Sequence, residues 1–517
     1  MPEIELKLRA TPARLKQALA RLKKRAVKGS TFKKNLRAIY FDTAKDNLHA
    51  KGLSLRIRDE DGRFVQTLKQ DARGGDAFTR GEWSDDVAAA TPVLLGTRSG
   101  RKLRQVWKDV SLVPRFRTVI ARKGLEICPR RGSRIEVVRD EGEILAIGRD
   151  DNMIHVSEIE LELKKSSPGD IYGLALDILD ACPVQIETRA KSDRGYALVS
   201  PGAEVAAVKA EAPEKAGCDT LAEVLQAAAR RHFGQFLANM PGALKHDPAS
   251  IHQMRVAMRR LRSALCGVRG LLPEVEYESV SLKLEFLLQS LGAARDWEVL
   301  TARISELDDE GKIAGHAKSV QRAVALRKTR ALDLAANAVG SGKSTKMVLE
   351  VMRWFEDLPT SRCGRKLKAR VRGAAPGLLM ELFDRVRRRG RHFEQQTVGD
   401  RHRLRIACKN LRYNVELFRS LYEKRRVERF LAQLKSVQDE LGHLNDVSSA
   451  RDLLSDLAKH SRRKAAADAV VARLEARDAG TKAHRDAPEG QAVLVAPTKS
   501  TSRPSKISRR WTRRPAW

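Results

Sequence analysis

Two short segments of this chain carry acidic side chains at alternating positions. Alternation with period two is typical of a β-strand, in which successive side chains point to opposite faces. The acidic rows are Glu3 and Glu5 in EIELK, and Glu158, Glu160 and Glu162 in SEIELELK. Carboxylate oxygens are the ligands that hard divalent cations such as Mg²⁺ and Mn²⁺ prefer. The two rows are therefore candidate metal ligands, if the fold brings them together.

The strand-like segments between these rows carry mostly arginine and lysine. The basic positions are Arg56 and Arg58 in LRIR, Lys69 in TLK, Arg80 in TRGEW, and Arg115 and Arg117 in PRFRT. A solvated sheet face would mix the two signs of charge, whereas these strands keep them apart. Closing the sheet into a barrel would bring the acidic rows together among the basic ones, with the apolar rows facing helices such as 12–26. Such a lumen suits a ligand with several phosphates and a divalent cation.

Residues 1–200 resemble the CYTH domains, also called triphosphate tunnel metalloenzymes. The resemblance rests on EIELK (3–7), YFDT (40–43), GLSLRIR (52–58), TLK (67–69), FRT (116–118), RIEVVRDEGEI (134–144), SEIELELK (157–164) and KSDRGYAL (191–198). It implies an eight-stranded antiparallel tunnel flanked by helices, an α+β fold. It also implies metal binding by Glu3, Glu5, Glu160 and Glu162, with Glu158 as a further candidate. It implies phosphate binding by Lys7, Arg56, Arg58, Lys69, Arg80, Arg117 and Lys191. We add Arg115 and Arg194 as further candidates for this role.

The resemblance implies a phosphoanhydride hydrolase. The basic tunnel and Mg²⁺ or Mn²⁺ would neutralise the substrate and align a water with the terminal phosphorus, and Glu5, Lys7 and Glu160 are the expected catalytic residues. The products from tripolyphosphate would be phosphate and pyrophosphate. Relatives with this fold cyclise ATP or hydrolyse thiamine triphosphate. Both activities stay open as alternatives, as do a nucleoside triphosphatase and a non-catalytic polyphosphate-granule protein. No further base-binding motif is obvious, which favours inorganic triphosphate.

From about residue 218 to 478 the sequence pattern is helical and contains an internal repeat. IHQMRVAMRRLRSAL (251–265) matches RHRLRIACKNLRYNV (401–415), and LGAARD (291–296) matches LGHLND (441–446), both at an offset of 150 residues. Two matches at one offset indicate a duplicated helical unit, with repeats at about 218–375 and 376–478. Each copy places three basic residues and a histidine on one helix face. They are His252, Arg255, Arg259 and Arg262 in the first copy, and His402, Arg405, Lys409 and Arg412 in the second.

The basic faces predict a bound anion, because neither 251–262 nor 401–412 contains an acidic residue. The duplicated pattern resembles the CHAD domain, which is often found behind CYTH domains. This resemblance implies two pseudo-symmetric four-helix bundles around a basic channel that binds inorganic polyphosphate. The few aromatic residues in 218–478 argue against single-stranded nucleic acid as the ligand, and we expect no specific nucleic-acid partner. GSGKST (340–345) looks like a phosphate-binding loop, but its flanks predict helices and no buried strand precedes it.

Composition is consistent with a multidomain protein that binds polyanions. The 517 residues include 99 lysines and arginines against 65 acidic residues, a net charge of +34, which favours polyanionic partners. We expect a linker at 201–217 and a disordered basic tail at 479–517. The six scattered cysteines, the N-terminus and the lack of a long apolar run predict a cytoplasmic protein without a membrane anchor, with polyphosphate granules as a possible location. Metal preference and oligomeric state do not follow from the sequence.

Overall fold

The structure, a computed structural model, describes most of the chain. It covers residues 3–71, 79–107, 111–165, 167–200, 206–209, 218–309, 317–458 and 464–485. Most of the expected linker and residues 486–517 of the expected tail lie outside the described residues. Helix α15 (Lys464–Arg485) extends beyond residue 478, where the sequence predicts the tail to begin. Within the described part, no helix is both long and apolar enough to cross a membrane.

The chain forms two compact units, and neither is continuous in sequence. The first comprises Met1–Glu211 together with Phe233–Gly242 and Ala338–Asp357, and the second comprises the rest. The first unit therefore includes α11 (Gly342–Asp357), which packs against α4 (Pro168–Ala181). Lys346 of α11 pairs with Asp180 of α4 at 3.1 Å. The glycine-rich GSGKST segment joins α10 (Ala317–Val339) to α11, so it is preceded by a helix and not by a strand.

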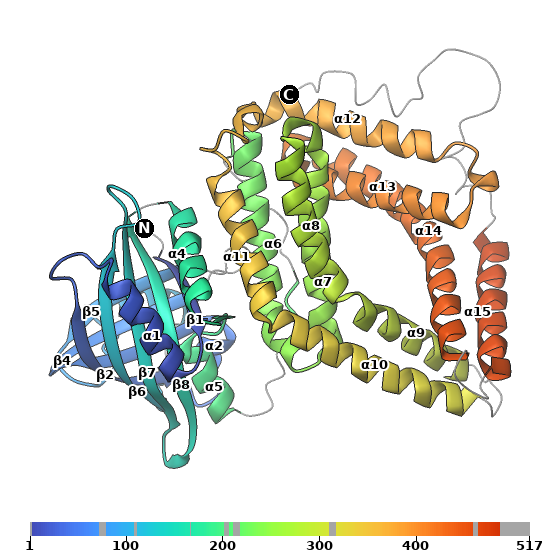
Figure 1. Ribbon diagram of the computed structural model, residues 1–517. Helices are drawn as coiled ribbons and strands as arrows, with labels where there is room; N and C mark the ends of the chain where they lie inside the picture. The colour runs from blue at the N-terminus through green and yellow to red at the C-terminus, as the bar shows by residue number, and fades with distance from the viewer. Residues whose placement is uncertain are drawn as a thin grey trace. The chain divides into compact units, whose positions relative to one another are not determined.

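A nine-stranded antiparallel sheet forms the first unit and closes into a barrel (Figure 1, blue to teal). The strand order is β5-β4-β3-β2-β6-β7-β8-β1-β9, and β1 also pairs with β5 through Glu3↔Arg80. The strands are β1 (Glu3–Arg9), β2 (Phe32–Asp42), β3 (Leu53–Glu60), β4 (Arg63–Asp71), β5 (Thr79–Val87), β6 (Val113–Ile127), β7 (Arg134–Ala146), β8 (Arg149–Lys165) and β9 (Gln185–Glu187). The predicted barrel is confirmed, and the short β9 adds a ninth strand beside β1.

Helices cover the outer face of the barrel because the outward rows of the strands are apolar. Leu6 and Leu8 of β1 and Leu161 of β8 are fully buried. Helix α1 (Pro12–Lys23) contacts β7 and β8, and α4 contacts β8 and β1, as expected for helices on an apolar surface. Helices α2 (Asn47–Ala50) and α3 (Arg98–Val106) cover a second outer cluster around Leu55 and Leu68.

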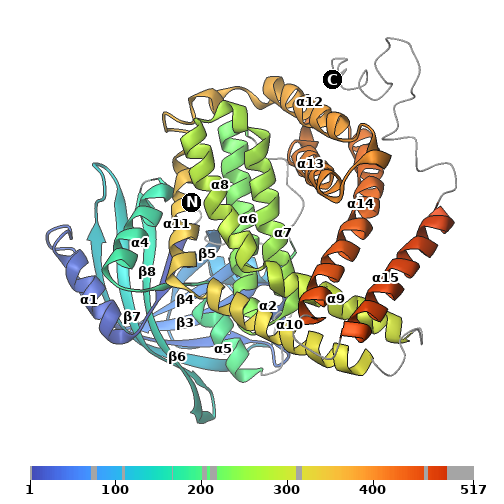
Figure 2. The same cartoon turned by 45° about the vertical axis from the view of Figure 1, so that its right-hand side comes forward.

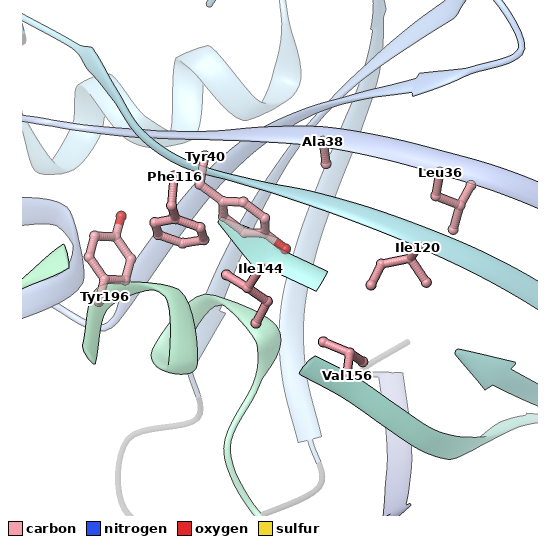
Figure 3. Packing of buried hydrophobic residues seen from close by; sticks show 8 residues of the cluster. All are labelled: Leu36, Ala38, Tyr40, Phe116, Ile120, Ile144, Val156 and Tyr196. Atoms are coloured by element: carbon pink, nitrogen blue, oxygen red, sulfur yellow. The ribbon is translucent and has the colours of Figure 1, made fainter. Parts of the chain in front are cut away.

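Part of the barrel interior is apolar, which the sequence pattern does not predict. Eight buried side chains from β2, β6, β7, β8 and α5 (Lys191–Val199) form this inner cluster (Figure 3). They are Leu36, Ala38, Tyr40, Phe116, Ile120, Ile144, Val156 and Tyr196. The long strands carry charged inward residues over one part of their length and apolar ones over the next. The apolar part packs against α5, and the charged part is left available for a binding or catalytic site.

Gly195 of α5 allows this packing because it has no side chain. A larger residue at this position should therefore destabilise the protein. A Cβ at this position would lie 2.2 Å from Cε2 of Phe116, too close for any real contact. Gly195→Ala should therefore lower the free energy of unfolding by about 1–3 kcal/mol, the usual range for overpacking. Urea unfolding followed by circular dichroism measures this. Gly377→Ala in α12 (Val371–Arg389), where a Cβ would meet no atom within 4 Å, is the control and should be neutral or stabilising. Equal stability of Gly195→Ala and wild type would contradict the packing described here.

The helical region repeats its elements in the order that the sequence predicts. Helix α7 (Pro248–Gly267) is followed by a 3₁₀ turn at Arg269–Leu271 and by α8 (Glu274–Ser290), which lies beside it (Figure 2). Helix α13 (Val398–Leu417) is followed by a 3₁₀ turn at Arg419–Leu421 and by α14 (Lys424–Ala458). The copies differ further on. In the first copy, α8 ends before Leu291 and a new helix, α9 (Gly292–Asp309), follows. In the second copy, α14 continues without a break through the matching Leu441.

The two copies contact each other through their signature helices, α7 and α13. Ser263 Oγ lies 2.8 Å from Asn410 Oδ1, and the Arg260 guanidinium lies 5.6 Å from the ring centroid of Tyr413. Residues 260 and 410, like 263 and 413, occupy matching places in the two copies. The two contacts are therefore equivalent under exchange of the copies, as a pseudo-two-fold axis between α7 and α13 requires. This supports the duplication predicted from the sequence.

Candidate active site

A cavity of about 460 Å³ occupies the charged part of the barrel. Its walls come from strands β1 to β8 and from the start of α5. The charged lining residues are Glu5, Lys7, Lys34, Arg56, Arg58, Glu60, Lys69, Glu82, Arg122, Glu136, Asp140, Glu160, Glu162, Lys164 and Lys191. The barrel thus gathers acidic and basic side chains from segments far apart in the sequence, as the alternating pattern predicts.

One wall of the cavity is acidic, and strand register explains why. Glu5 of β1 pairs across the sheet with Glu162 of β8, which pairs in turn with Glu136 of β7. Side chains at directly opposite positions have Cβ atoms about 4.5–5.5 Å apart, so the three carboxylates form a row. Lys7 Nζ lies 2.5 Å from Glu5, and Lys164 Nζ lies 2.6 Å from Glu162. Two lysines thus face the three carboxylates of the row, which leaves a negative charge uncompensated.

A second acidic group lies deeper and is compensated by its neighbours. Oxygens of Asp140, Glu158 and Glu160 lie within 4.8 Å of one another, and all three residues are buried. Lys191 Nζ contacts the three at 2.7, 2.5 and 2.8 Å. Arg122 contacts Asp140 at 2.6 Å and Glu160 at 2.7 Å. Three buried carboxylates thus share a network of buried cations, which holds their side chains in place.

This network shifts the pKa values of its members. Burial would raise the pKa of Glu160, but Lys191, Lys7 and Arg122 hold it well below its ordinary value. Burial lowers the pKa of Lys191, yet Asp140, Glu158 and Glu160 raise it well above its ordinary value. Both groups are therefore charged at neutral pH. Burial raises the pKa of Glu136, which Lys164 lowers in part and Glu162 raises further.

The opposite wall presents cations. Arg56 is half-buried, and its buried Nε has no hydrogen-bond partner among the described residues. The charge of Arg56 and burial lower the pKa of its neighbour Arg58 to about 10. Two adjacent half-buried guanidinium groups repel each other, so a bound anion would stabilise them. Lys69 of β4 pairs with Glu82 of β5 at 2.8 Å.

Several residues of the expected site lie elsewhere. Arg115 pairs with Asp46 at 2.7 Å outside the cavity, and the side chain of Arg117 is exposed there. In β6 the inward face is that of Phe116, Thr118 and Ile120, so the neighbouring odd-numbered residues point outward. The side chains of Arg194 and Glu158 are buried and do not line the cavity. They contact each other at 2.5 Å. The side chains of Glu3 and Arg80 lie outside the described residues.

A basic cluster occupies the first copy of the helical repeat. Three arginines lie close enough for their charges to interact: Arg255 and Arg259 of α7, and Arg295 of α9. Burial is the main cause that lowers the pKa of Arg255 to about 10, and the charge of Arg259 lowers it further. Burial and the charge of Arg295 also lower the pKa of His252. Arg255 Nη1 donates to the Leu288 carbonyl at 2.9 Å, and its Nε has no partner among the described residues.

The glycine of the LGxxxD motif makes room for this arginine. A Cβ at Gly292 would lie 3.3 Å from Arg255 Nη1, and one at Gly442 would lie 3.5 Å from Arg405 Nη2. The same guanidinium–glycine contact thus occurs in both copies. A Cβ at Gly292 would make an unusually tight contact with the arginine, whereas one at Gly442 would be at ordinary contact distance.

Acidic partners come from residues outside the two basic segments. Arg262 lies 3.2 Å from Glu285 of α8, and Arg412 lies 3.0 Å from Glu416. The expectation of wholly uncompensated faces is therefore wrong for these two arginines, because α8 supplies the carboxylate for Arg262 and the next turn of α13 supplies the one for Arg412. Arg255 and Arg259 make no ion pair with a carboxylate in the described part of the chain. His402, Arg405 and Lys409 occupy the matching face of α13, and the side chains of Asn445 and Asp446 lie outside the described residues.

Two family models match this chain in succession. The CYTH domain matches residues 1–195, and the CHAD domain matches residues 227–455. The chain is a CYTH–CHAD protein. The fold agrees with this assignment, because an antiparallel barrel-like sheet precedes a helical region.

Solved structures similar to each part differ in how much of this CYTH–CHAD protein they cover. The CHAD domain from the plant Ricinus communis is 27% identical, with a TM-score of 0.48, over 55% of this chain and 93% of its own length. A putative adenylyl cyclase from Hippeastrum, described as having a dominant triphosphatase activity, is 18% identical, with a TM-score of 0.29, over 38% of this chain and 94% of its own. A putative adenylate cyclase from Bacillus halodurans is 22% identical, with a TM-score of 0.25, over 37% and 96%.

CYTH tunnel enzymes use divalent metal ions, and carboxylates of this chain fit one. The deep group of Asp140, Glu158 and Glu160 has the spacing for a metal site. Its charges are already compensated by Lys191, Arg122 and Arg194, whereas Lys7 and Lys164 compensate only part of the charge of Glu5, Glu136 and Glu162. Oxygen ligands and uncompensated negative charge are what Mg²⁺ or Mn²⁺ requires. The row at the cavity surface is therefore the better candidate, with Glu160 beside it.

The prediction from sequence missed seven of the fifteen charged residues that line the CYTH cavity, among them three on β6 and β7. Arg122, Glu136 and Asp140 line it, although none is among the residues expected there. Glu136 and Asp140 stand at alternate positions of RIEVVRDEGEI with Val138 between them, so the charged row is interrupted. Arg122 follows Phe116, Thr118 and Ile120 on the same face of β6. Both signals are present in the sequence, but they require knowledge of which face points inward.

Proposed function

We propose that this protein is a metal-dependent inorganic triphosphatase that hydrolyses tripolyphosphate to phosphate and pyrophosphate. The cavity carries the proposal, since it sets an acidic wall on β1, β7 and β8 opposite cations on β3 and β4. A chain of phosphates lying between these walls would contact cations along its length and a metal ion on one side. Charge stabilisation of this kind is the main requirement for phosphoryl transfer.

In this proposal, each wall has a distinct task. Arg56, Arg58 and Lys69 bind phosphate oxygens, and Arg122, Lys191 and Lys7 add positive charge on the acidic side. Glu5, Glu136, Glu160 and Glu162 would hold Mg²⁺ or Mn²⁺. Such an ion would supply positive charge beside the phosphate oxygens and acidify a water molecule. Lys191, Lys7 and Arg122 also hold the pKa of Glu160 well below its ordinary value, so that it stays ionised and can hold the ion. Glu3 and Arg80, whose backbones pair at the closure of the barrel, remain candidates for the same tasks.

We further propose that the CHAD domain binds long-chain polyphosphate. Two half-buried arginines, Arg255 and Arg259, lie near Arg295 and make no ion pair in the described part of the chain, whereas Arg295 pairs with Glu298 at 2.6 Å. Such a cluster favours a dense polyanion, and the matching face of α13 supplies a second site. Binding there would bring polyphosphate to the protein and is compatible with a location on cytoplasmic polyphosphate granules.

We expect the protein to prefer tripolyphosphate to ATP by at least about tenfold in kcat/KM. The two aromatic rings that line the cavity are already packed against other groups. Tyr40 stacks on Phe116, with ring centroids 4.5 Å apart, and the ring of Phe32 lies where a Cβ of Gly124 would be. Among the described residues, each ring that lines the cavity therefore has one side covered, which disfavours stacking by a nucleobase. Initial rates with tripolyphosphate, ATP and thiamine triphosphate, each with Mg²⁺ or Mn²⁺, measure the preference.

The same panel separates the proposal from its alternatives. Cyclic AMP among the products, or a higher kcat/KM for ATP, would assign the chain to the adenylate cyclases or nucleoside triphosphatases. A higher kcat/KM for thiamine triphosphate would identify a thiamine triphosphatase. If no triphosphate is cleaved with either metal, the protein is a non-catalytic polyphosphate binder.

A further inference from the structure

The charges inside the cavity nearly cancel. Eight lysine and arginine side chains line it, against seven aspartate and glutamate side chains. Five of the acidic residues lie on β1, β7 and β8, where they form the candidate metal wall. The other two, Glu60 of β3 and Glu82 of β5, lie on the wall that presents cations. A metal ion held by the acidic wall does not explain these two residues.

Glu60 and Glu82 contact the side chains expected to bind phosphate. Glu82 stands opposite Lys69 in the β4–β5 ladder, and its Oε2 lies 2.8 Å from Lys69 Nζ. Glu60 Oε1 lies 3.0 Å from Arg58 Nε, and its Oε2 lies 3.5 Å from Lys34 Nζ. Carboxylate and phosphate oxygens accept hydrogen bonds from the same donors. Glu82 therefore occupies a place beside Lys69 that a phosphate oxygen would need. Glu60 neutralises Arg58 as an ion-pair partner, and Arg58 Nε makes no hydrogen bond among the described residues, so it can still donate to a phosphate.

We propose that Glu60 and Glu82 are internal counter-ions, which a triphosphate must displace from Arg58 and Lys69 when it binds. This inference rests on the proposed function and assigns a specificity role to residues of that site. The counter-ions weaken the binding of any bare anion, because each anion must replace an existing ion pair. A metal ion at the opposite wall neutralises part of the charge of a triphosphate, so the counter-ions weaken its binding less. The tunnel therefore selects the metal complex of the triphosphate.

The surroundings of Glu82 allow this exchange. Its side chain is 29% exposed and that of Lys69 is 18% exposed, so neither is locked in a dry interior. Ser84, two residues further along the same face of β5, donates its hydroxyl to Glu82 Oε1 at 3.1 Å. This hydrogen bond can persist when Lys69 turns to a phosphate. Glu82 can therefore release the lysine without being left as an unpaired charge.

The test is the affinity of Glu82→Gln for tripolyphosphate without metal. Isothermal titration calorimetry of the full chain in EDTA should show binding about tenfold tighter than for wild type, the effect expected for removing one nearby negative charge. With Mg²⁺ present, KM should fall while kcat stays the same or decreases, because pyrophosphate also leaves more slowly. Glu82→Asp retains the charge and should remain close to wild type. Asp177→Asn removes one surface carboxylate outside the cavity, from a pair with Arg25, and should leave the affinity unchanged.

Each outcome decides the proposal. Unchanged or weaker binding by Glu82→Gln, together with the same result for Glu60→Gln, would overturn it, since these carboxylates would then only orient the cations. Tighter binding by Asp177→Asn of equal size would also overturn it, because net charge alone would explain the effect. Absence of turnover in the wild type would refute the proposed triphosphatase function, but calorimetry would still decide the role of the counter-ions.

Discussion

Protein carrying Glu5→Gln should hydrolyse tripolyphosphate at least about a hundred times more slowly than the wild type. Glu5 stands at one end of the row that continues through Glu162 and Glu136, and it is the closest carboxylate to Lys7. Glutamine keeps the size of the side chain but removes the charge that a divalent cation needs, and losing a metal ligand removes most of the catalytic benefit of the ion. Initial rates at saturating Mg²⁺ or Mn²⁺ measure the loss.

The fold should survive this substitution, because the side chain lines a cavity that admits water. The melting temperature should change by no more than a few degrees. Glu143→Gln on β7 is the matched control, since Glu143 is half-exposed outside the cavity and faces His155. Its activity should equal that of the wild type. Full activity of Glu5→Gln, or an equal loss in Glu143→Gln, would show that the acidic wall does not take part in catalysis.

Replacing Arg259 and Lys409 together by glutamine should weaken binding of long-chain polyphosphate by at least about tenfold at 0.15 M salt. The two residues occupy matching places in the CHAD repeats, and Arg259 makes no ion pair in the described part of the chain. Polyanion binding releases condensed counterions, so affinity falls as salt rises. Each lost contact should reduce the slope of log affinity against log salt by about 0.7, as for single-stranded nucleic acids. Titration of the full chain in EDTA at several salt concentrations measures both quantities.

The structure supplies a control of equal charge for this experiment. Arg262 and Arg412 already face Glu285 and Glu416, so their replacement by glutamine should cost less affinity. Competition with duplex DNA then separates a defined site from a diffuse basic surface. Displacement of polyphosphate by DNA at equal phosphate concentration, or equal losses in the two double variants, would show that overall charge governs binding.

Local patterns were sufficient to predict the strands and their acidic rows, but not which face of every strand points inward. EIELK and SEIELELK alternate strictly, and Glu5, Glu160 and Glu162 of these rows line the cavity. In PRFRT the arginines seemed the functional residues, yet β2 pairs with β6 so that Phe116 stacks on Tyr40 and the arginines point outward. A register shift at Tyr40 and Phe41 belongs to this pairing, and no local pattern encodes it. Arg122 therefore replaces Arg115 and Arg117 among the cavity residues.

Contacts between distant segments account for the other differences. The repeat at an offset of 150 residues predicted α7 and α13 and their basic faces. The acidic partner of Arg262 lies on α8, 23 residues away, where helical periodicity within one segment cannot reveal it. The apolar cluster beneath α5 escaped prediction for the same reason, because its members come from four strands and a helix.

The position of α11 has a practical consequence for the design of truncated fragments of this protein. The helix lies inside the stretch matched by the CHAD family model, yet its buried face, with Val348, Met352 and Phe355, belongs to the compact unit that contains the barrel. A fragment ending near residue 200 would leave the face of α4 that carries Gly169, Gly173 and Asp180 without this cover. Fragments cut at the family boundaries should therefore aggregate more readily than the intact chain, and a soluble barrel fragment would need residues 338–357 added back as a fusion or a peptide.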